Sequence, residues 1–245
     1  MLDKEIVDLS GTLDFQPNRR PSPVHLIELL CRRAGVSNDY KGPECFLSSE
    51  ELSDAKRFVD SAKHDSTKAV IAITTRTSTR NKEWRPERWQ ELVQKLSSKV
   101  RWLHLGESQS PPLSGVEYLS FSPRQTVAVT RYVDGVVTLD TFLLHAAATQ
   151  RLGTAGVITL LGSSRPECVS YPTFHNIFFS SYDCQPCGRP YNSFDLRILH
   201  DGNFDRWPNG KPKKWECEHV ACMDLIDVDT VADAVRSLIL KEGES

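Results

Sequence analysis

The feature that most constrains this chain is the alternation of short apolar stretches with amphipathic stretches between residues 68 and 161. The stretches 68–74, 135–139 and 156–161 are short, mainly apolar and rich in β-branched residues, which is typical of buried strands. The stretch 101–105, closed by Gly106, is a further predicted strand. Between them, apolar residues recur at helical spacing. Because strand and helix alternate at this spacing, the sequence predicts an α/β fold: a parallel sheet with helices on both faces.

Further elements complete this pattern. Gly35 is placed to end a helix, Ser48 to cap one, and Pro86 to occupy a first helical turn, while Asp227 or Asp229 could cap the last helix. The other predicted elements are helices over about 23–34, 48–62, 86–96, 122–132, 141–152 and 229–240, and a short strand over 116–119.

Composition excludes several classes of protein. The chain has 245 residues, a formal net charge of −2, 39% hydrophobic and 25% charged residues, which is close to a globular average. This charge gives no reason to expect a nucleic-acid partner. The longest apolar runs fall far short of the roughly 20 residues that cross a bilayer, and the first residues lack a signal-peptide pattern. We therefore expect a cytoplasmic chain without a membrane span.

In a parallel α/β sheet, ligands bind where loops leave the carboxyl ends of the strands. The loop after Thr74 is basic, and its side chains could gather phosphate oxygens beside a helix start. The alternative is a solvated charged loop. The basic residues of this loop and of the helix start that follows are Arg76, Arg80, Lys82, Arg85 and Arg88.

The loop after Leu139 contains a second candidate. Thr141 stands at a predicted helix start, and His145 follows one turn later on the same face. Backbone N–H groups, the hydroxyl and the imidazole could together bind a phosphate. The alternative is that Asp140 or Thr141 caps its own helix and His145 is satisfied in the core.

The loop after Leu161 is small and polar, and Gly162 and Ser163 would allow a ligand to approach the backbone closely. An ordinary turn is the alternative. The sequence contains no phosphate-binding P-loop, no G-x-G-x-x-G dinucleotide fingerprint and no G-x-S-x-G element of serine hydrolases.

Three ordered stretches resemble glycosyltransferase family nine, the ADP-heptose–lipopolysaccharide heptosyltransferases. KEWRPERW at 82–89 resembles the family's K-x-W-P-x-E-R-W, and DTFLLHAAA at 140–148 resembles its D-T-G/F-x-x-H-x-A-A. The strand and turn at 156–166 resemble its P-x-V-x-L-F-G-x-S-x-P. The resemblance covers residues 24 to 240 and implies the GT-B architecture, in which two Rossmann-like domains face a cleft.

This resemblance implies a division of the chain and a set of donor-binding residues. Residues 65–245 would form the Rossmann-like nucleotide-sugar domain with a Cys-rich loop insert at 182–223, and residues 1–64 a remnant of the acceptor domain with linker helices. Lys82 would be the phosphate-contacting lysine, and Asp140, Thr141 and His145 would lie beside the diphosphate. The donor would be a nucleotide-diphospho-sugar, possibly ADP-heptose, and the acceptor a glycan or a protein.

Phe142 occupies the position where lipopolysaccharide heptosyltransferases usually have glycine. In this it resembles the family branch that includes protein heptosyltransferases. The resemblance identifies no catalytic base in this chain.

Seven cysteines, an odd count, argue against a disulfide framework. Cys184 and Cys187 form a C-x₂-C pair, and Cys217 and Cys222 a C-x₄-C pair. Thiolates at these spacings suit structural zinc or rubredoxin-like iron, and His219 could replace one of them. The alternative is four unligated thiols. The segment also resembles part of family nine, where iron is associated with the protein heptosyltransferase branch.

Three functions follow from these observations. The first is a glycosyltransferase that uses a nucleotide-diphospho-sugar. The second is a non-catalytic nucleotide-sugar-binding or scaffold subunit that needs a partner chain, or another copy of itself, for the acceptor half. The third is a metal-stabilised interaction module whose donor pocket has decayed, and Lys82, Asp140, Thr141 and His145 weigh against it.

Overall fold

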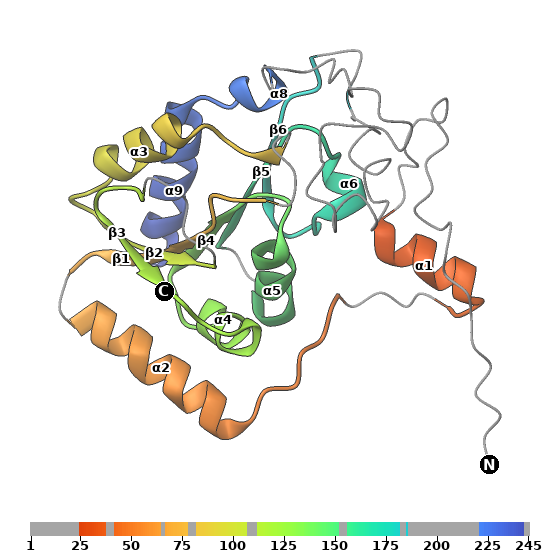
Figure 1. Ribbon diagram of the computed structural model, residues 1–245, viewed down its shortest axis with the longest axis horizontal. Coiled ribbons are helices and arrows are strands. Elements are labelled where there is room, and N and C mark those ends of the chain that lie inside the picture. The colour runs from red at the N-terminus through yellow and green to blue at the C-terminus, as the bar shows by residue number, and fades with distance from the viewer. Residues whose placement is uncertain are drawn as a thin grey trace, which may run out of the picture.

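A computed structural model describes residues 25–37, 42–64, 67–77, 82–106, 112–151, 156–181, 185 and 221–242 of the chain. Within these residues, six strands form one parallel sheet with helices on both faces (Figure 1). The predicted α/β fold is therefore confirmed. None of the described helices is both long and apolar enough to cross a membrane.

The predicted strands and helices are found close to their expected bounds. The strands are β1 Ala69–Ile73, β2 Val100–Leu105, β3 Val116–Leu119, β4 Gly135–Thr138, β5 Val157–Leu161 and β6 His175–Phe178. The helices are α1 Leu26–Ala34, α2 Ser49–His64, α3 Pro86–Lys95, α4 Pro123–Thr130, α5 Phe142–Arg151, α6 Pro166–Val169, α8 Ala221–Asp224 and α9 Val228–Glu242.

The strand order is β3-β2-β1-β4-β5-β6, so the chain winds outward from the centre of the sheet in both directions. The strand β1 pairs with β2 on one side and with β4 on the other. The connection after β1 therefore leaves toward one edge, and the connection after β4 leaves toward the opposite edge. Sheets of this kind usually bind ligands at such a reversal of strand order, outside the carboxyl ends of the strands, and we call this position between β1 and β4 the crevice.

Side chains alternate between two hydrophobic layers, as the two-residue period of a strand requires. In β1, Ile71 and Ile73 pack in the layer beneath α3 and α9, while Val70 and Ala72 pack beneath α2, α4 and α5. Figure 1 shows these two groups of helices on opposite faces of the sheet. Both faces of the central strands are thus removed from water, which explains why their sequences are almost wholly apolar.

The helix ends follow the sequence signals. Gly35 ends α1 with a φ of 68°, a left-handed conformation that glycine adopts without a Cβ penalty. Ser48 and Glu51 exchange side-chain and backbone hydrogen bonds of 3.1 and 2.7 Å at the start of α2. Asp227 accepts the Thr230 N–H at 2.7 Å at the start of α9. These caps satisfy N–H and C=O groups that lack intrahelical partners.

The helix α9 approaches the sheet closely at Gly135. A Cβ at this position would lie 2.9 Å from both Cδ atoms of Leu238 and 3.0 Å from Ile71 Cδ1. Glycine here therefore allows a helix-to-strand distance that no side chain would permit without movement of its neighbours.

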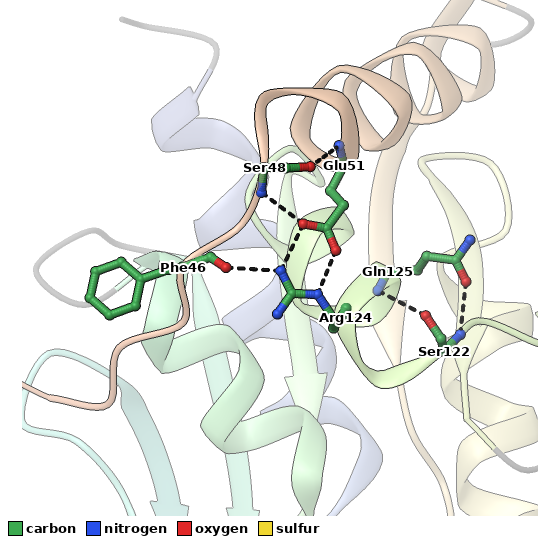
Figure 2. A network of polar contacts seen from close by, with 6 residues as sticks. All are labelled: Phe46, Ser48, Glu51, Ser122, Arg124 and Gln125. Atoms are coloured by element: carbon green, nitrogen blue, oxygen red, sulfur yellow. Dashed lines mark hydrogen bonds and ion pairs between the residues drawn. The ribbon is translucent and has the colours of Figure 1, made fainter.

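An ion pair joins α4 to the start of α2 on the surface (Figure 2). The Arg124 guanidinium donates to both carboxylate oxygens of Glu51, at 2.5 and 2.8 Å, and to the Phe46 carbonyl at 2.9 Å. Mainly the hydrogen bonds from Arg124 lower the pKa of Glu51 to about 2. We call this group, Phe46, Glu51 and Arg124, the surface clasp.

Three elements lie outside the sequence prediction: the edge strand β6 and the single-turn helices α6 and α8. The helix α2 shares a hydrophobic layer with α4 and α5. The division of the chain at residue 64 stays a prediction. Most of the predicted insert at 182–223 lies outside the described residues.

Candidate functional site

The predicted site residues Lys82 and Asp140 meet at the crevice between β1 and β4. Lys82 Nζ lies 2.8 Å from Asp140 Oδ2, and the two side chains are only 8% and 11% exposed. The hydroxyl of Ser164, which follows β5, donates to the same carboxylate oxygen at 2.8 Å. Three loops that are distant in sequence thus bring an ammonium, a carboxylate and a hydroxyl together. We call Lys82, Asp140 and Ser164 the buried triad.

Lys82 is held in place by the aromatic residues that follow it. Trp84 is 1% exposed, and its indole N–H donates to the Ile226 carbonyl at 2.9 Å. Its ring meets Trp89 of α3 edge to face, with 5.1 Å between centroids. These contacts bury Trp84, two residues after Lys82, in the hydrophobic layer under α3 and α9. Lys82 is therefore positioned by the packing of its neighbour as well as by its ion pair.

The other basic residues of this segment have different partners. Arg76 is exposed and pairs with Glu83 at 3.1 Å, while Arg85 donates to Asp224 at 2.6 Å. Arg88 donates to the backbone carbonyl of Asp224 at 2.9 Å. Arg85 and Arg88 thus fasten α3 to α8. Lys82 is the basic residue of the segment that the structure brings to Asp140; Arg80 lies outside the described residues, and a phosphate role for Arg76 stays a prediction.

Thr141 caps α5. Its side-chain oxygen accepts the Leu143 N–H at 3.1 Å, as expected if Thr141 caps its own helix. The neighbouring Phe142 side chain is 52% exposed at the start of the helix. This cap is compatible with a phosphate contact, because the hydroxyl oxygen can accept one hydrogen bond while the hydroxyl hydrogen donates to a ligand. The phosphate contact itself stays a prediction.

His145 makes a hydrogen bond that the sequence does not predict. Its Nδ1 lies 2.8 Å from the hydroxyl oxygen of Tyr171. Burial lowers the pKa of His145 below its ordinary value of 6.5, opposed by the charge of Asp140 and reinforced by that of Lys82. The imidazole is therefore neutral at pH 7 and lies within electrostatic reach of the buried triad.

The loop after β5 packs tightly against α8. A Cβ at Gly162 would lie 2.6 Å from Met223 Sδ and 3.0 Å from Cys222 Sγ. The Gln185 side-chain amide donates to the Gly162 carbonyl at 2.9 Å. Next to this anchor, Ser163 is 3% exposed, and its hydroxyl has no hydrogen-bond partner in the part of the chain that the structure describes. Because a buried hydroxyl without a partner is costly, Ser163 is a candidate ligand contact.

The predicted metal ligands fall mostly outside the described residues. This is so for Cys184, Cys187 and Cys217, whereas Cys222 is buried beside Gly162. Among the residues that the structure describes, no group of three or more His, Cys, Asp or Glu side chains could hold a metal ion. The four-cysteine site stays a prediction.

Comparison with known proteins identifies the fold. No protein-family model matches the chain, and no curated protein matches its sequence. A crystal structure of a family 9 glycosyl transferase from Veillonella parvula matches with a TM-score of 0.59 and 16% identity, covering 93% of this chain and 63% of that one. The E. coli ADP-heptose lipopolysaccharide heptosyltransferase II gives a TM-score of 0.55 at 14% identity, covering 86% of this chain and 57% of that one.

The third similar structure is TibC from enterotoxigenic E. coli, described as a bacterial iron-containing dodecameric glycosyltransferase. Its TM-score is 0.58 at 17% identity, covering 89% of this chain and 54% of that one. The fold is thus that of a Rossmann-like α/β protein, with the buried triad at the reversal of strand order. More particularly, the chain has the fold of the family-nine glycosyltransferases and spans between 54% and 63% of the length of these three structures.

Proposed function

We propose that this chain binds a nucleotide-diphospho-sugar and takes part in transfer of the sugar to an acceptor. The observation that carries the proposal is the buried triad at the crevice between β1 and β4, where Lys82 lies 2.8 Å from Asp140. A buried ammonium beside a helix N-terminus is suited to an anionic ligand, because both favour negative charge and little water screens them.

The chemistry of sugar transfer fits this arrangement. The acceptor hydroxyl oxygen forms a bond to the anomeric carbon while the bond from that carbon to the diphosphate breaks. The bonding electrons leave with the nucleoside diphosphate, and the proton of the acceptor passes to a base. Negative charge therefore grows on the diphosphate, where Lys82 and the start of α5 would stabilise it. Arg76, Arg80, Thr141, His145 and Ser163 are the further proposed donor contacts.

The donor class is proposed from the similar folds. One of them is named an ADP-heptose heptosyltransferase, and TibC is described in complex with ADP-D-beta-D-heptose. We propose ADP-heptose as the first donor to test, with a glycan or a protein as acceptor. Exposed Phe142 stands beside Asp140 and would contact the sugar or the acceptor.

A second candidate function is a nucleotide-sugar-binding subunit whose acceptor half is supplied by another chain or another copy. The observation that favours it is that Asp140, the carboxylate of the buried triad, already accepts from Lys82 and Ser164. This carboxylate orients the site and is not placed as a base. A donor-binding chain without its own base would bind nucleotide and transfer nothing alone.

Calorimetric titration with ADP, UDP, GDP and ADP-heptose tests the proposal. We expect ADP to bind, and Lys82→Met to weaken binding at least tenfold, because hydrogen bonds to charged groups contribute about 1.5–3 kcal/mol. Lys56→Met is the matched control, since Lys56 forms an exposed pair with Asp60. Binding by Lys82→Met with wild-type affinity would refute the role of Lys82, and sugar release by the isolated chain would exclude the second candidate.

We also propose that Cys184, Cys187, Cys217 and Cys222 hold one structural zinc or iron ion. The burial of Cys222 against Gly162, and the bond from Gln185 to the same glycine, support a location of the cluster near the loop after β5. Such a site would order an insert that lacks a core of its own. Measurement of bound metal in the Cys184→Ser/Cys187→Ser variant tests the site; an unchanged metal content would contradict it.

A further inference from the structure

The ring of Tyr171 contacts two histidines from distant parts of the chain. Its hydroxyl oxygen is 2.8 Å from His145 Nδ1, and its ring centroid is 5.5 Å from that of His25, which precedes α1. Tyr171 also meets Phe174 edge to face, with 5.2 Å between ring centroids. Tyr171 is 1% exposed, so these rings fix the position of its hydroxyl.

The hydrogen bond at Nδ1 determines which nitrogen of His145 carries the proton. A neutral imidazole has one N–H and one lone pair for hydrogen bonding. If the tyrosine hydroxyl donates to Nδ1, the proton resides on Nε2; if Nδ1–H donates to the tyrosine oxygen, Nε2 has only a lone pair. The neutral state follows from burial, which lowers the pKa of His145.

The position of His145 on α5 indicates where Nε2 lies. Side chains on a helix lean toward its N-terminus, and residues four apart share a face. His145 is one turn after Thr141, so its ring leans toward the helix start and Asp140. Since Nδ1 faces Tyr171, Nε2 is the nitrogen left for a ligand. A diphosphate oxygen is an acceptor and needs a donor here.

We propose that Tyr171 is a positioning residue: its hydroxyl donates to His145 Nδ1 and so keeps the proton on Nε2, which then donates to a diphosphate oxygen of the bound ligand. The contact between His145 Nε2 and the ligand rests on the proposed function. The hydrogen bond from the Tyr171 hydroxyl to Nδ1, and the tautomer that it sets, are independent of the proposed function. Second partners of this kind commonly fix the tautomer and the orientation of functional histidines.

His25 completes the enclosure of Tyr171. Its Nδ1 accepts the Ile27 N–H at 3.2 Å, so the side chain caps α1 while its ring covers Tyr171. Burial, followed by the charge of His145, lowers the pKa of His25. Tyr171 is thus packed against two neutral imidazoles and removed from water, and a hydrogen bond is stronger in such surroundings.

A second histidine–tyrosine pair provides a control within the same chain. The rings of His104 and Tyr118 stack with 4.7 Å between centroids. The Tyr118 hydroxyl oxygen, however, accepts the Leu113 N–H at 2.7 Å, and His104 Nε2 faces the Thr75 N–H at 3.3 Å. Removal of the Tyr118 hydroxyl therefore leaves the hydrogen bonds of its histidine in place.

Nitrogen NMR of the histidine side chains tests the proposal in wild-type protein at pH 7. We expect His145, assigned by loss of its signals in His145→Gln, to be protonated on Nε2. In Tyr171→Phe we expect a mixture of tautomers and an ADP dissociation constant about tenfold higher. Tyr118→Phe should change neither the His145 signals nor ADP affinity.

A proton on Nδ1 in the wild-type protein, or unchanged His145 signals in Tyr171→Phe, would overturn the proposal. The wild-type spectrum decides the first point even if Tyr171→Phe fails to fold. If wild-type protein binds no nucleotide, the proposed function fails while the spectrum still decides the role of Tyr171. His145→Gln, whose amide nitrogen can replace Nε2–H, should bind ADP more tightly than His145→Asn; the reverse order would also count against it.

Discussion

Two ion pairs of this protein, one in the proposed ligand site and one on the surface, differ in burial and in the geometry of their contacts. Lys82 and Asp140 are 8% and 11% exposed and lie where three loops meet. Arg124 and Glu51 are 54% and 27% exposed and join two helices on the surface (Figure 2). The difference in burial matters because water and salt screen the exposed pair strongly and the buried pair weakly.

The partners of the two cations differ as well. The planar guanidinium of Arg124 donates hydrogen bonds to both carboxylate oxygens of Glu51 and to the Phe46 carbonyl. Such bidentate geometry suits a structural contact between two chain segments. The ammonium of Lys82 has freely rotating donors, and an anionic ligand can compete with Asp140 for it. The comparison supports the proposed binding role of the buried triad and a structural role for the surface clasp.

The largest effect is expected from removal of the buried carboxylate. Asp140→Ala leaves Lys82 buried without this partner and Ser164 without its acceptor, so the free energy of unfolding should fall by about 3–5 kcal/mol in urea denaturation. Asp140→Asn retains acceptor capacity and should lose less. Asp60→Ala is the control, since it removes an exposed carboxylate from Lys56; equal losses for Asp140→Ala and Asp60→Ala would remove the distinction between the two kinds of pair.

The second prediction concerns mild acid. Burial lowers the pKa of His104 from 6.5 to about 4, so between these pH values the unfolded chain binds more protons than the folded protein. Stability is then complete above pH 6.5 and decreases as pH falls to about 4, by about 3 kcal/mol for a shift of this size. His25 and His145 add to the loss in the upper part of the window, because their pKa values are lowered too.

Urea denaturation between pH 7 and pH 4 measures this loss. The same decrease in the free energy of unfolding should occur in the Glu51→Gln variant, because the Glu51 carboxylate of the folded protein, with a pKa of about 2, stays ionised over this pH range. A free energy of unfolding that stays constant over this range would contradict the burial of these imidazoles in the neutral form.

The third prediction isolates the surface clasp in stronger acid. The pKa of Glu51 is lowered to about 2 from an ordinary 4.5, so its contribution is present above pH 4.5 and is lost as pH falls toward 2. Glu51→Gln should lower the melting temperature slightly at neutral pH and not at pH 2. A difference between variant and wild type that persists at pH 2 would mean that Glu51 acts through packing.

The smallest effect is the response to salt. In double-mutant cycles, the coupling between Arg124 and Glu51 should decrease in 1 M NaCl, where the screening length is about 3 Å. The coupling between Lys82 and Asp140 should change little, because that pair is buried. Equal salt sensitivity of the two coupling energies would mean that solvent screens both ion pairs to the same extent, which would contradict the burial of Lys82 and Asp140.

The sheet and most helices were predictable because their signals are local. The periodicity of apolar residues distinguishes strands from helices, and residues such as Gly35 and Pro86 mark where helices end or begin. The position of the loops that carry Lys82 and Asp140 at one edge of the sheet also followed, since parallel strands share a carboxyl edge; the ion pair between the two side chains did not. The strand β6 was missed because its sequence, HNIF, contains one buried residue and no clear alternation.

The contacts that refine the site depend on long-range packing. Arg85 and Arg88 look like phosphate ligands in sequence, yet they bind α8 and its neighbouring residues, more than a hundred residues away. Tyr171 resembles an ordinary core aromatic residue, and only the folded chain brings its hydroxyl to His145. Ser164 follows the predicted site residue Ser163, and the polar composition of their loop was the one sequence feature that pointed to a site role for Ser164.

The bond from Trp84 to the Ile226 carbonyl has a consequence for the order of folding. Its partners are 142 residues apart, and closure of so long a loop is entropically unfavourable until other parts of the sheet have formed. During synthesis, the segment that carries Lys82 emerges well before the residues that anchor it. The sheet can therefore assemble first, and the segment that carries Lys82 reaches its final position only when residues 221–242 have docked.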